Sequence, residues 1–382
     1  MRILALVTDA YGGRGGIAQH NRHLLDALCI APQVAEVVAL PRLVVEPPGL
    51  LPDGLTYVTA AARGKAAYLQ ALLALGLWRS TFETVVCGHL NLLPLAVLAA
   101  VRHRARLLLV VHGIEAWTPR GEVVKRMLRR VDEIVAVSSF TRRRFLAWSG
   151  VGEARARVIP NAIDLGAYGP GPKRPDLVAR YGLEGKKVIL TLGRMDARER
   201  YKGHDELLDV LPALAKEEGR LAWLVVGDGD DRPRLEAKAR ALGVADHVVF
   251  AGYVPDGEKA DHYRLADVFA MPGRGEGFGI VYLEALACGI PVVASSADAS
   301  REAVSDGRMG EVVDPEDRAA LLAGLRRAFA RAGGRVPAGL DTFSVSRFRA
   351  RWHGLLSATP ALPTPALSVR KGTPISPERA HA

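Results

Sequence analysis

Two glutamates eight positions apart lie in the stretch GRGEGFGIVYLEALACG, residues 273–289. The strand-like run DVFAMP precedes it and IVYLEALACG is helix-like, so we expect Glu276 in a loop at a strand end and Glu284 inside the next helix. That helix would begin with free backbone amides that attract anions, those of Phe278, Gly279 and Ile280. A carboxylate accepts hydrogen bonds from two vicinal hydroxyls. The pattern favours a ligand with both hydroxyls and phosphate, although Glu284 alone would read as a surface glutamate.

The segment LGRMDARERYKGHDELLDVL, residues 192–211, carries a cation on each side of a loop. Arg194 follows a predicted strand, and Lys202 precedes a predicted helix. The pair suits a diphosphate, because a guanidinium can grip it with two hydrogen bonds and an ammonium acts as a point charge. The alternative is a solvated loop, since other charged side chains surround both cations.

A glycine-rich loop, TDAYGGRGGIAQH, follows the first predicted strand. Its residues Gly13 to Ala18 fit the G-x-G-x-x-A pattern of dinucleotide-binding loops, in which glycines let the backbone approach a phosphate. An NAD(P)-dependent oxidoreductase is therefore one alternative function, and a purely structural turn is another. NAD would require an acidic residue at the end of the second strand, but that strand ends in Pro41 and Arg42.

His112 ends the apolar run LLLVV and precedes Gly113. Ligands of parallel sheets bind beyond the carboxyl ends of the strands, which is where this histidine would stand. We therefore regard His112 as a candidate site residue, although a lone histidine is often structural.

Strand-like and helical patterns alternate in two sets along the chain. Near-continuous Val, Ile and Leu runs are typical of parallel strands buried on both faces. A Pro- and Gly-rich stretch separates the sets, so we predict an α/β fold of two doubly wound, Rossmann-like domains facing across a cleft. The predicted parts are an N-terminal domain at 1–165, a linker at 166–176, a C-terminal domain at 177–342, a segment at 343–356 and a disordered tail at 357–382.

Composition indicates a globular protein with an anionic partner. The 382 residues are 49% apolar, and residues 1–170 hold 20 Lys and Arg against 12 Asp and Glu. A basic half attracts anions, so a non-catalytic protein that binds anionic glycans or nucleic acid is a second alternative. No nucleic-acid-binding signature supports the latter partner. No apolar run reaches the roughly 20 residues of a spanning helix, and no signal peptide is evident, which indicates a cytoplasmic protein. The three cysteines have no metal or disulfide spacing.

Together these motifs resemble the retaining glycosyltransferases of family 4, which have the GT-B fold. The resemblance covers roughly residues 1–356, and its most specific part is the E-x7-E pair in EGFGIVYLEALACGIPVVAS. The motifs VIPNAID, GR, KG, VVGDG and FAGYVP follow in the family's order, with Ala162 where the family often has Gly. The resemblance implies that FSVSRFRARWHGLL, residues 343–356, is a helix that crosses back onto the N-terminal domain.

The resemblance also implies roles for the candidate residues. Arg194 and Lys202 would bind the donor pyrophosphate, and Glu276 and Glu284 would contact the sugar and the ribose. The implied donor-binding set is Gly16, Arg194, Lys202, Val254, Phe278, Gly279, Ile280 and Glu284. The implied catalytic set is His112, Arg194, Lys202 and Glu276, and the implied acceptor-binding residues are Gly15 and His112.

The activity implied by the resemblance is transfer of a hexose from a nucleotide-diphosphate sugar with retention of anomeric configuration. The family works without a metal or other cofactor, and this sequence lacks an Asp-x-Asp signature. The two cations and the amides would offset the charge of the leaving diphosphate. Because no carboxylate nucleophile is obvious, we favour front-face attack.

The expected donor is GDP-mannose or a UDP-hexose, because RYKGHDELL and the opening residues resemble bacterial exopolysaccharide-assembly members. Asp256 would accept hydrogen bonds from a guanine or would cap a helix. The acceptor would be a saccharide, in particular a lipid-linked one.

Two basic segments predict docking on the inner face of the cell membrane. The basic residues are Arg120, Lys125, Arg126, Arg129, Arg130, Arg142, Arg143 and Arg144. Phe145, Leu146 and Trp148, which follow the second basic segment, would insert into the membrane interface. The alternative is a solvated helix face with Phe145 and Trp148 in the core.

Overall fold

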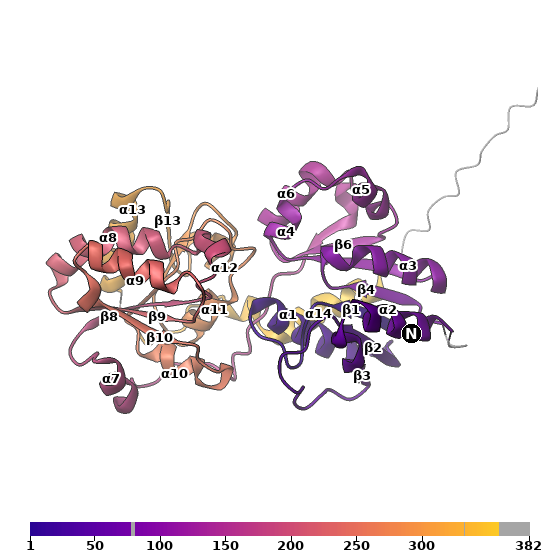
Figure 1. The fold of residues 1–382 in the computed structure, drawn as a ribbon, viewed down its shortest axis with the longest axis horizontal. Helices are drawn as coiled ribbons and strands as arrows, with labels where there is room; N and C mark the ends of the chain where they lie inside the picture. Colours follow the sequence, from indigo (N-terminus) through magenta and orange to yellow (C-terminus); the bar gives the residue numbers. More distant parts are fainter. Residues whose placement is uncertain (78–80, 332, 359–382) are drawn as a thin grey trace, which may run out of the picture.

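The computed structural model describes residues 1–77, 81–331 and 333–358. It consists of two α/β lobes, each built on a parallel sheet (Figure 1). This confirms the predicted α/β fold class of two doubly wound domains. The tail predicted to be disordered lies, from residue 359 onward, outside the described residues.

The N-terminal lobe contains a seven-stranded sheet in the order β3-β2-β1-β4-β5-β6-β7, all parallel. Its strands are β1 Arg2–Val7, β2 Glu36–Pro41, β3 Leu55–Tyr57, β4 Thr84–Cys87, β5 Arg106–Val111, β6 Glu133–Ala136 and β7 Ala156–Val158. Its helices are α1 Gly16–Cys29, α2 Lys65–Leu77, α3 Leu93–His103, α4 Ile114–Trp117, α5 Glu122–Leu128 and α6 Ser139–Ser149.

The C-terminal lobe contains a six-stranded parallel sheet in the order β10-β9-β8-β11-β12-β13. Its strands are β8 Lys187–Leu192, β9 Leu221–Val226, β10 Val248–Gly252, β11 Val268–Ala270, β12 Val292–Ser295 and β13 Glu311–Val313. The remaining helices are α7 Pro175–Tyr181, α8 His204–Glu218, α9 Arg232–Ala241, α10 Lys259–Arg264, α11 Ile280–Ala287, α12 Ser300–Ala303, α13 Arg318–Ala330 and α14 Val345–Ser357.

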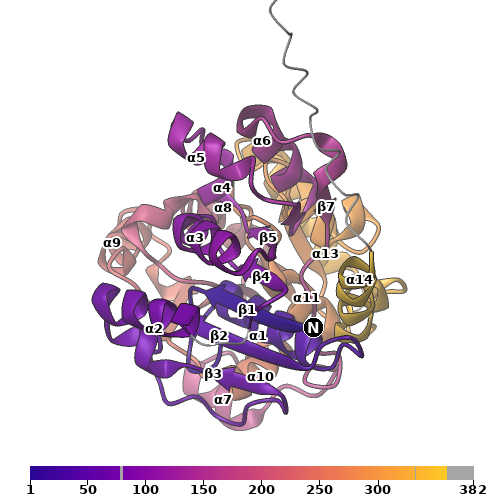
Figure 2. The same cartoon turned by 90° about the vertical axis from the view of Figure 1, so that its right-hand side faces the viewer.

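Each sheet is covered by helices on both faces, which explains the unbroken apolar strand sequences. On the N-terminal sheet, α2, α3, α5 and α6 pack on one face and α1 with α14 on the other (Figure 2). Every predicted strand is present, and β3 is an additional one at the sheet edge. β3 was missed because it has only three residues, all partly or wholly exposed.

The chain leaves the N-terminal lobe and returns to it through paired segments. The backbone of Ile163 accepts a hydrogen bond from Val345 at 3.2 Å and donates one to Phe343 at 2.9 Å. Helix α14 then packs on α1, and its buried Phe348 and Trp352 join the N-terminal core. The last helix therefore belongs spatially to the first lobe (Figure 1).

Candidate active site

Lys202 and Glu276 form the centre of the polar arrangement at the carboxyl ends of the C-terminal strands. Nζ of Lys202 lies 2.8 Å from Oε1 of Glu276, and their side chains are 15% and 17% exposed. Burial lowers the pKa of Lys202, but the charge of Glu276 and the hydrogen bond to it outweigh this and leave that pKa above its ordinary value. Lys202 is therefore a cation fixed in place, as a diphosphate site requires.

The turn at Gly203 fixes Lys202 before helix α8. Gly203 has φ +89°, and a Cβ there would lie 2.7 Å from the backbone carbonyl of Pro272. The strand end before the E-x7-E loop thus packs directly on the lysine turn, and only glycine allows this approach.

Arg194, just after the end of β8, is the second cation of the site. Its guanidinium pairs with Glu199 at 2.5 Å, and Glu199 also lies 3.8 Å from Nζ of Lys202. The Arg194 side chain is 73% exposed. Both predicted cations therefore surround one glutamate, and Arg194 has room to turn toward a ligand.

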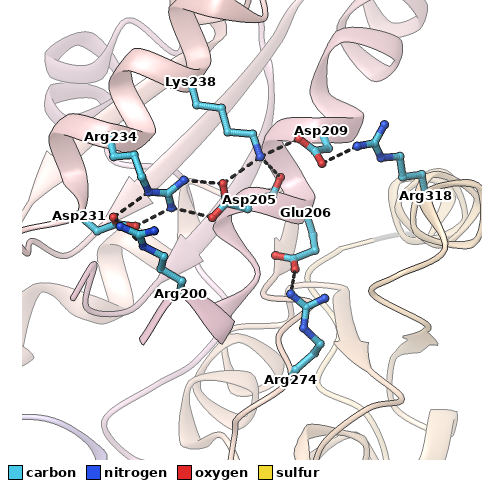
Figure 3. Close-up of polar contacts among 9 residues, drawn as sticks. All are labelled: Arg200, Asp205, Glu206, Asp209, Asp231, Arg234, Lys238, Arg274 and Arg318. Atoms are coloured by element: carbon cyan, nitrogen blue, oxygen red, sulfur yellow. Dashed lines mark hydrogen bonds and ion pairs between the residues drawn. The ribbon is translucent and has the colours of Figure 1, made fainter. Parts of the chain in front are cut away.

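A network of ion pairs holds two loops, the one that carries Arg194 and Lys202 and the one that carries Glu276, to helices α8 and α9 (Figure 3). Arg274 pairs with Glu206 of α8 at 2.5 Å. Arg200 pairs at 3.1 Å with Asp231, to which Arg234 also binds. The two loops are thus fastened to α8 and α9 by charge-assisted contacts, which favours a preformed site.

The loop that carries Glu276 is held by a buried aspartate. Oδ2 of Asp298 accepts a hydrogen bond from the backbone amide of Glu276 at 2.9 Å, and Oδ1 accepts one from the Ser300 hydroxyl at 2.6 Å. Burial raises the pKa of Asp298 to about 6. Asp298 was not predicted as a site residue, although its position as a polar residue just after strand β12 could have indicated it.

Helix α11 begins with backbone amides beside Glu276. Its N-cap, Gly279, has φ +89°, and among the described residues the amides of Phe278 and Gly279 have no acceptor. The side chains of Phe278 and Ile280 are buried. Gly16 of α1 faces this point, since a Cβ on it would lie 3.9 Å from Cδ1 of Ile280. Two helix N-termini, one from each lobe, therefore meet where a phosphate would lie.

Glu284 lies deeper than expected, at 1% exposure. Its Oε2 accepts a hydrogen bond of 2.7 Å from the hydroxyl of Tyr263. The interpretation of Glu284 as a surface glutamate is therefore wrong. The sequence offered no local signal for Tyr263, which is 21 positions away.

His112 lies at the carboxyl end of β5, and three contacts fix it. Its Nε2 lies 2.8 Å from the carbonyl oxygen of Gly88, and its backbone amide donates to Glu115 at 2.6 Å. The ring of His20 packs edge-on against it at 4.8 Å. Because the Gly88 carbonyl can only accept, Nε2 carries a proton, and a neutral His112 presents Nδ1 as an acceptor.

His112 also lies directly against the E-x7-E loop. A Cβ on Gly277 would fall 1.8 Å from the carbonyl oxygen of His112. Only a glycine at 277 permits this approach, so the glycines of GRGEGFG let the two lobes touch beside Glu276. The predicted acceptor residue Gly15 caps α1 with φ +87° and precedes Gly16, the α1 residue that faces Ile280.

The predicted base-contacting segment also bridges the lobes. Val254 is buried, while Asp256 pairs with Lys259 at 2.7 Å and with Arg22 of α1 at 3.3 Å. The Asp256 side chain caps no helix, so the capping alternative is wrong. Among residues 1–77, 81–331 and 333–358, no group of His, Cys, Asp or Glu could hold a metal ion.

The predicted membrane-inserting residues are not free for that role. Phe145 is fully buried, and the Trp148 indole donates to the Ala116 carbonyl at 2.8 Å. Helix α6 therefore places Phe145 in the core, so the prediction that Phe145 inserts into a membrane is wrong. Exposed apolar side chains instead lie on the neighbouring helices α2, α3 and α5, namely Leu69, Leu73, Leu98, Val101 and Val123.

Comparison with known protein families gives two matches in succession along the chain. Residues 14–167 match the family described as Glycosyltransferase Family 4. Residues 186–331 match the family described as Glycosyl transferases group 1. The two matches correspond to the two lobes, and they favour glycosyl transfer over the oxidoreductase alternative.

Two curated relatives come from Mycolicibacterium smegmatis. A GDP-mannose-dependent alpha-(1-6)-phosphatidylinositol monomannoside mannosyltransferase is 39% identical over 259 residues, which cover 62% of this chain and 67% of the relative. A phosphatidyl-myo-inositol mannosyltransferase is 31% identical over 336 residues, which cover 85% of this chain and 84% of the relative.

A solved structure shares the fold. Anabaena HepE in complex with UDP superposes with a TM-score of 0.73 at 20% identity, covering 94% of this chain and 100% of that protein. At this identity the likeness concerns the arrangement of the two lobes.

Proposed function

Since the chain belongs to glycosyltransferase family 4 and transfers a glycosyl group from a nucleotide sugar, we propose that it moves mannose from GDP-mannose to a phosphatidylinositol lipid. The relatives named above support both substrates. We favour this acceptor over the exopolysaccharide that the sequence suggested, because both relatives carry phosphatidylinositol in their names.

The observation that carries the proposal is the arrangement around Lys202. Lys202, which is partly buried, binds the carboxylate of Glu276, and helix α11 begins with its backbone amides beside that residue. A nucleotide sugar has a diphosphate for the cation and amides, and sugar hydroxyls for the carboxylate. Glu276 is thus suited to hold the mannose, and Lys202 to hold its leaving group.

We propose that the reaction retains the anomeric configuration and needs no metal. As the bond between C1 and the diphosphate oxygen breaks, negative charge grows on the diphosphate, and Lys202, Arg194 and the α11 amides offset it. The acceptor oxygen bonds to C1 from the same face, and its proton passes to the departing phosphate. Initial rates with excess EDTA test the metal claim: unchanged rates support it, and a complete loss that Mg²⁺ or Mn²⁺ restores contradicts it.

A lipid acceptor requires the N-terminal lobe to work at a membrane, and we propose that helices α2, α3 and α5 dock on its cytoplasmic face. No helix within the described residues is long and apolar enough to span a bilayer. These helices pack side by side, α2 on α3 and α3 on α5. They carry the five exposed apolar side chains, and Arg126, Arg129 and Arg130, in and just after α5, are exposed as well. Apolar and basic side chains together suit an anionic lipid surface.

A donor screen with the purified protein tests the proposed donor. GDP-mannose, GDP-fucose, UDP-glucose and UDP-galactose are each supplied with phosphatidylinositol vesicles, and release of the nucleoside diphosphate is measured. We expect release from GDP-mannose that depends on the lipid. Lipid-dependent release from a UDP-sugar alone would contradict the proposal.

A further inference from the structure

The carboxyl group of Glu284 is almost wholly out of water, so its partners must be specific. Removing such a group from water is unfavourable unless hydrogen bonds or ion pairs replace the hydration. The hydroxyl of Tyr263 supplies one such bond to Oε2, at 2.7 Å. Tyr263 lies on α10 and is itself 0% exposed, so its hydroxyl has no access to solvent.

Two further side chains lie close enough to Glu284 for its charge to affect them. Lys259, one turn before Tyr263 on α10, pairs with Asp256 at 2.7 Å. Burial lowers the pKa of Lys259, but the charge of Glu284 and the contact with Asp256 outweigh this and raise it. Tyr168, from the linker between the lobes, packs with its ring 6.2 Å from that of Tyr263. Helix α10 thus contacts Glu284 through Tyr263, and the linker packs beside that contact.

The Tyr263 contact leaves the carboxylate able to bind a ligand. A carboxylate has about four lone-pair positions, and Tyr263 occupies one of them. The hydrogen bond from Tyr263 fixes the rotation of the carboxylate plane. Without it, the carboxylate of Glu284 would be free to rotate. With it, the remaining positions keep one orientation toward two vicinal hydroxyls.

This step rests on the proposed function, in which Glu284 holds the ribose of the donor. We propose that Tyr263 is a positioning residue for donor binding. Its phenol does not touch the ribose, and it acts by fixing the carboxylate that does.

Isothermal titration with GDP and with 2′,3′-dideoxy-GDP tests this proposal, because only GDP offers the ribose hydroxyls. In Tyr263→Phe we expect the Kd for GDP to rise roughly three- to tenfold, the effect of one hydrogen bond, while the Kd for the dideoxy analogue stays unchanged. The matched control is Tyr68→Phe, which removes a buried hydroxyl bonded to the Leu40 carbonyl in the N-terminal lobe and should change neither Kd.

A double-mutant cycle separates positioning from a general structural effect. In a Glu284→Gln background, Tyr263→Phe should cost little further GDP affinity. Equal weakening of both nucleotides by Tyr263→Phe, or no weakening of either, would overturn the proposal. If the wild type binds GDP and the dideoxy analogue equally well, the ribose role of Glu284 and this proposal both fail, while donor binding itself stands. Failure of the wild type to bind any GDP would overturn the proposed function.

Discussion

Lys202 and Glu276, 74 positions apart, are bound to one another at 2.8 Å, and this pair links the two halves of the proposed donor site. The lysine belongs to the turn before α8, and the glutamate belongs to the loop before α11. Each neutralises the other. A diphosphate that binds here has to share the lysine with the glutamate, so Arg194 and the α11 amides must offset the remaining negative charge.

Replacing Lys202 with glutamine should weaken diphosphate binding selectively. We expect the Kd for GDP to rise roughly ten- to a hundredfold, since a charge-assisted contact contributes about 1.5–3 kcal/mol. Guanosine, which has no phosphate, should bind as before. Lys238→Gln is the matched control, because Lys238 lies in the same lobe and pairs with Asp205 and Asp209 rather than with Glu276 (Figure 3). Equal losses of GDP affinity in both variants would argue against the assignment.

Glu302 forms a contact that should favour the closed arrangement of the lobes. Its carboxylate, on α12, accepts hydrogen bonds from the amides of Ser139 and Phe140 at 2.8 and 2.7 Å, at the start of α6 in the other lobe. Glu302→Gln loses the charge that the helix N-terminus favours. We expect a larger radius of gyration by small-angle scattering and a KM for the donor raised a few-fold.

The control for this contact is Asp306→Asn, which breaks only the pair with Arg301 within the C-terminal lobe. This variant should leave the radius of gyration and the KM for the donor unchanged. A Glu302→Gln protein with the radius and KM of the wild type would show that the contact does not govern closure.

The overall fold was predictable because each strand has its own apolar run and parallel sheets require such runs. The cations and the E-x7-E pair were also evident, since Arg194 and Glu276 follow predicted strand ends and Lys202 precedes a predicted helix. Contacts between distant segments were not evident. Tyr263 meets Glu284 only after α10 folds against α11, and Phe145 fits either a core or a membrane face by pattern alone. Sequence periodicity identifies a helix face but does not identify what covers it.

Buried histidines should make the protein less stable in mild acid. Burial lowers the pKa of His23 and of His204 to about 4, below the roughly 6.5 of the unfolded chain. The unfolded state therefore binds more protons between pH 6.5 and 4, and the free energy of unfolding falls as the pH drops through this window. Asp298, whose pKa is raised to about 6, opposes the trend with a single group.

Thermal melts at pH 7.5, 6 and 5 check this dependence. We expect Tm to fall with pH, and to fall less in His23→Gln, which cannot take up the proton. His23 packs against Phe348 of α14, so its protonation should weaken the α1–α14 contact. A decline of the same size in His23→Gln would contradict the assignment.

The proposed docking surface on α2, α3 and α5 should bind anionic membranes in a salt-dependent way. Each basic residue near such a surface contributes about 1 kcal/mol, so replacing Arg126, Arg129 and Arg130 with glutamine should release the protein from phosphatidylinositol-rich vesicles. Co-sedimentation at low and high salt measures this. Replacement of Arg318, Arg326 and Arg327 on α13 is the control and should retain binding. Equal sedimentation with anionic and neutral vesicles, or none with either, would contradict docking.

The most direct measurement is the transfer of radiolabelled mannose from GDP-mannose into organic-extractable lipid by the purified protein, with phosphatidylinositol or its monomannoside as acceptor. We expect labelled lipid with the wild type and a large loss with Glu276→Gln and with Lys202→Gln, two variants on opposite sides of one ion pair. Absence of labelled lipid from GDP-mannose, alongside transfer from another nucleotide sugar, would contradict the proposed activity.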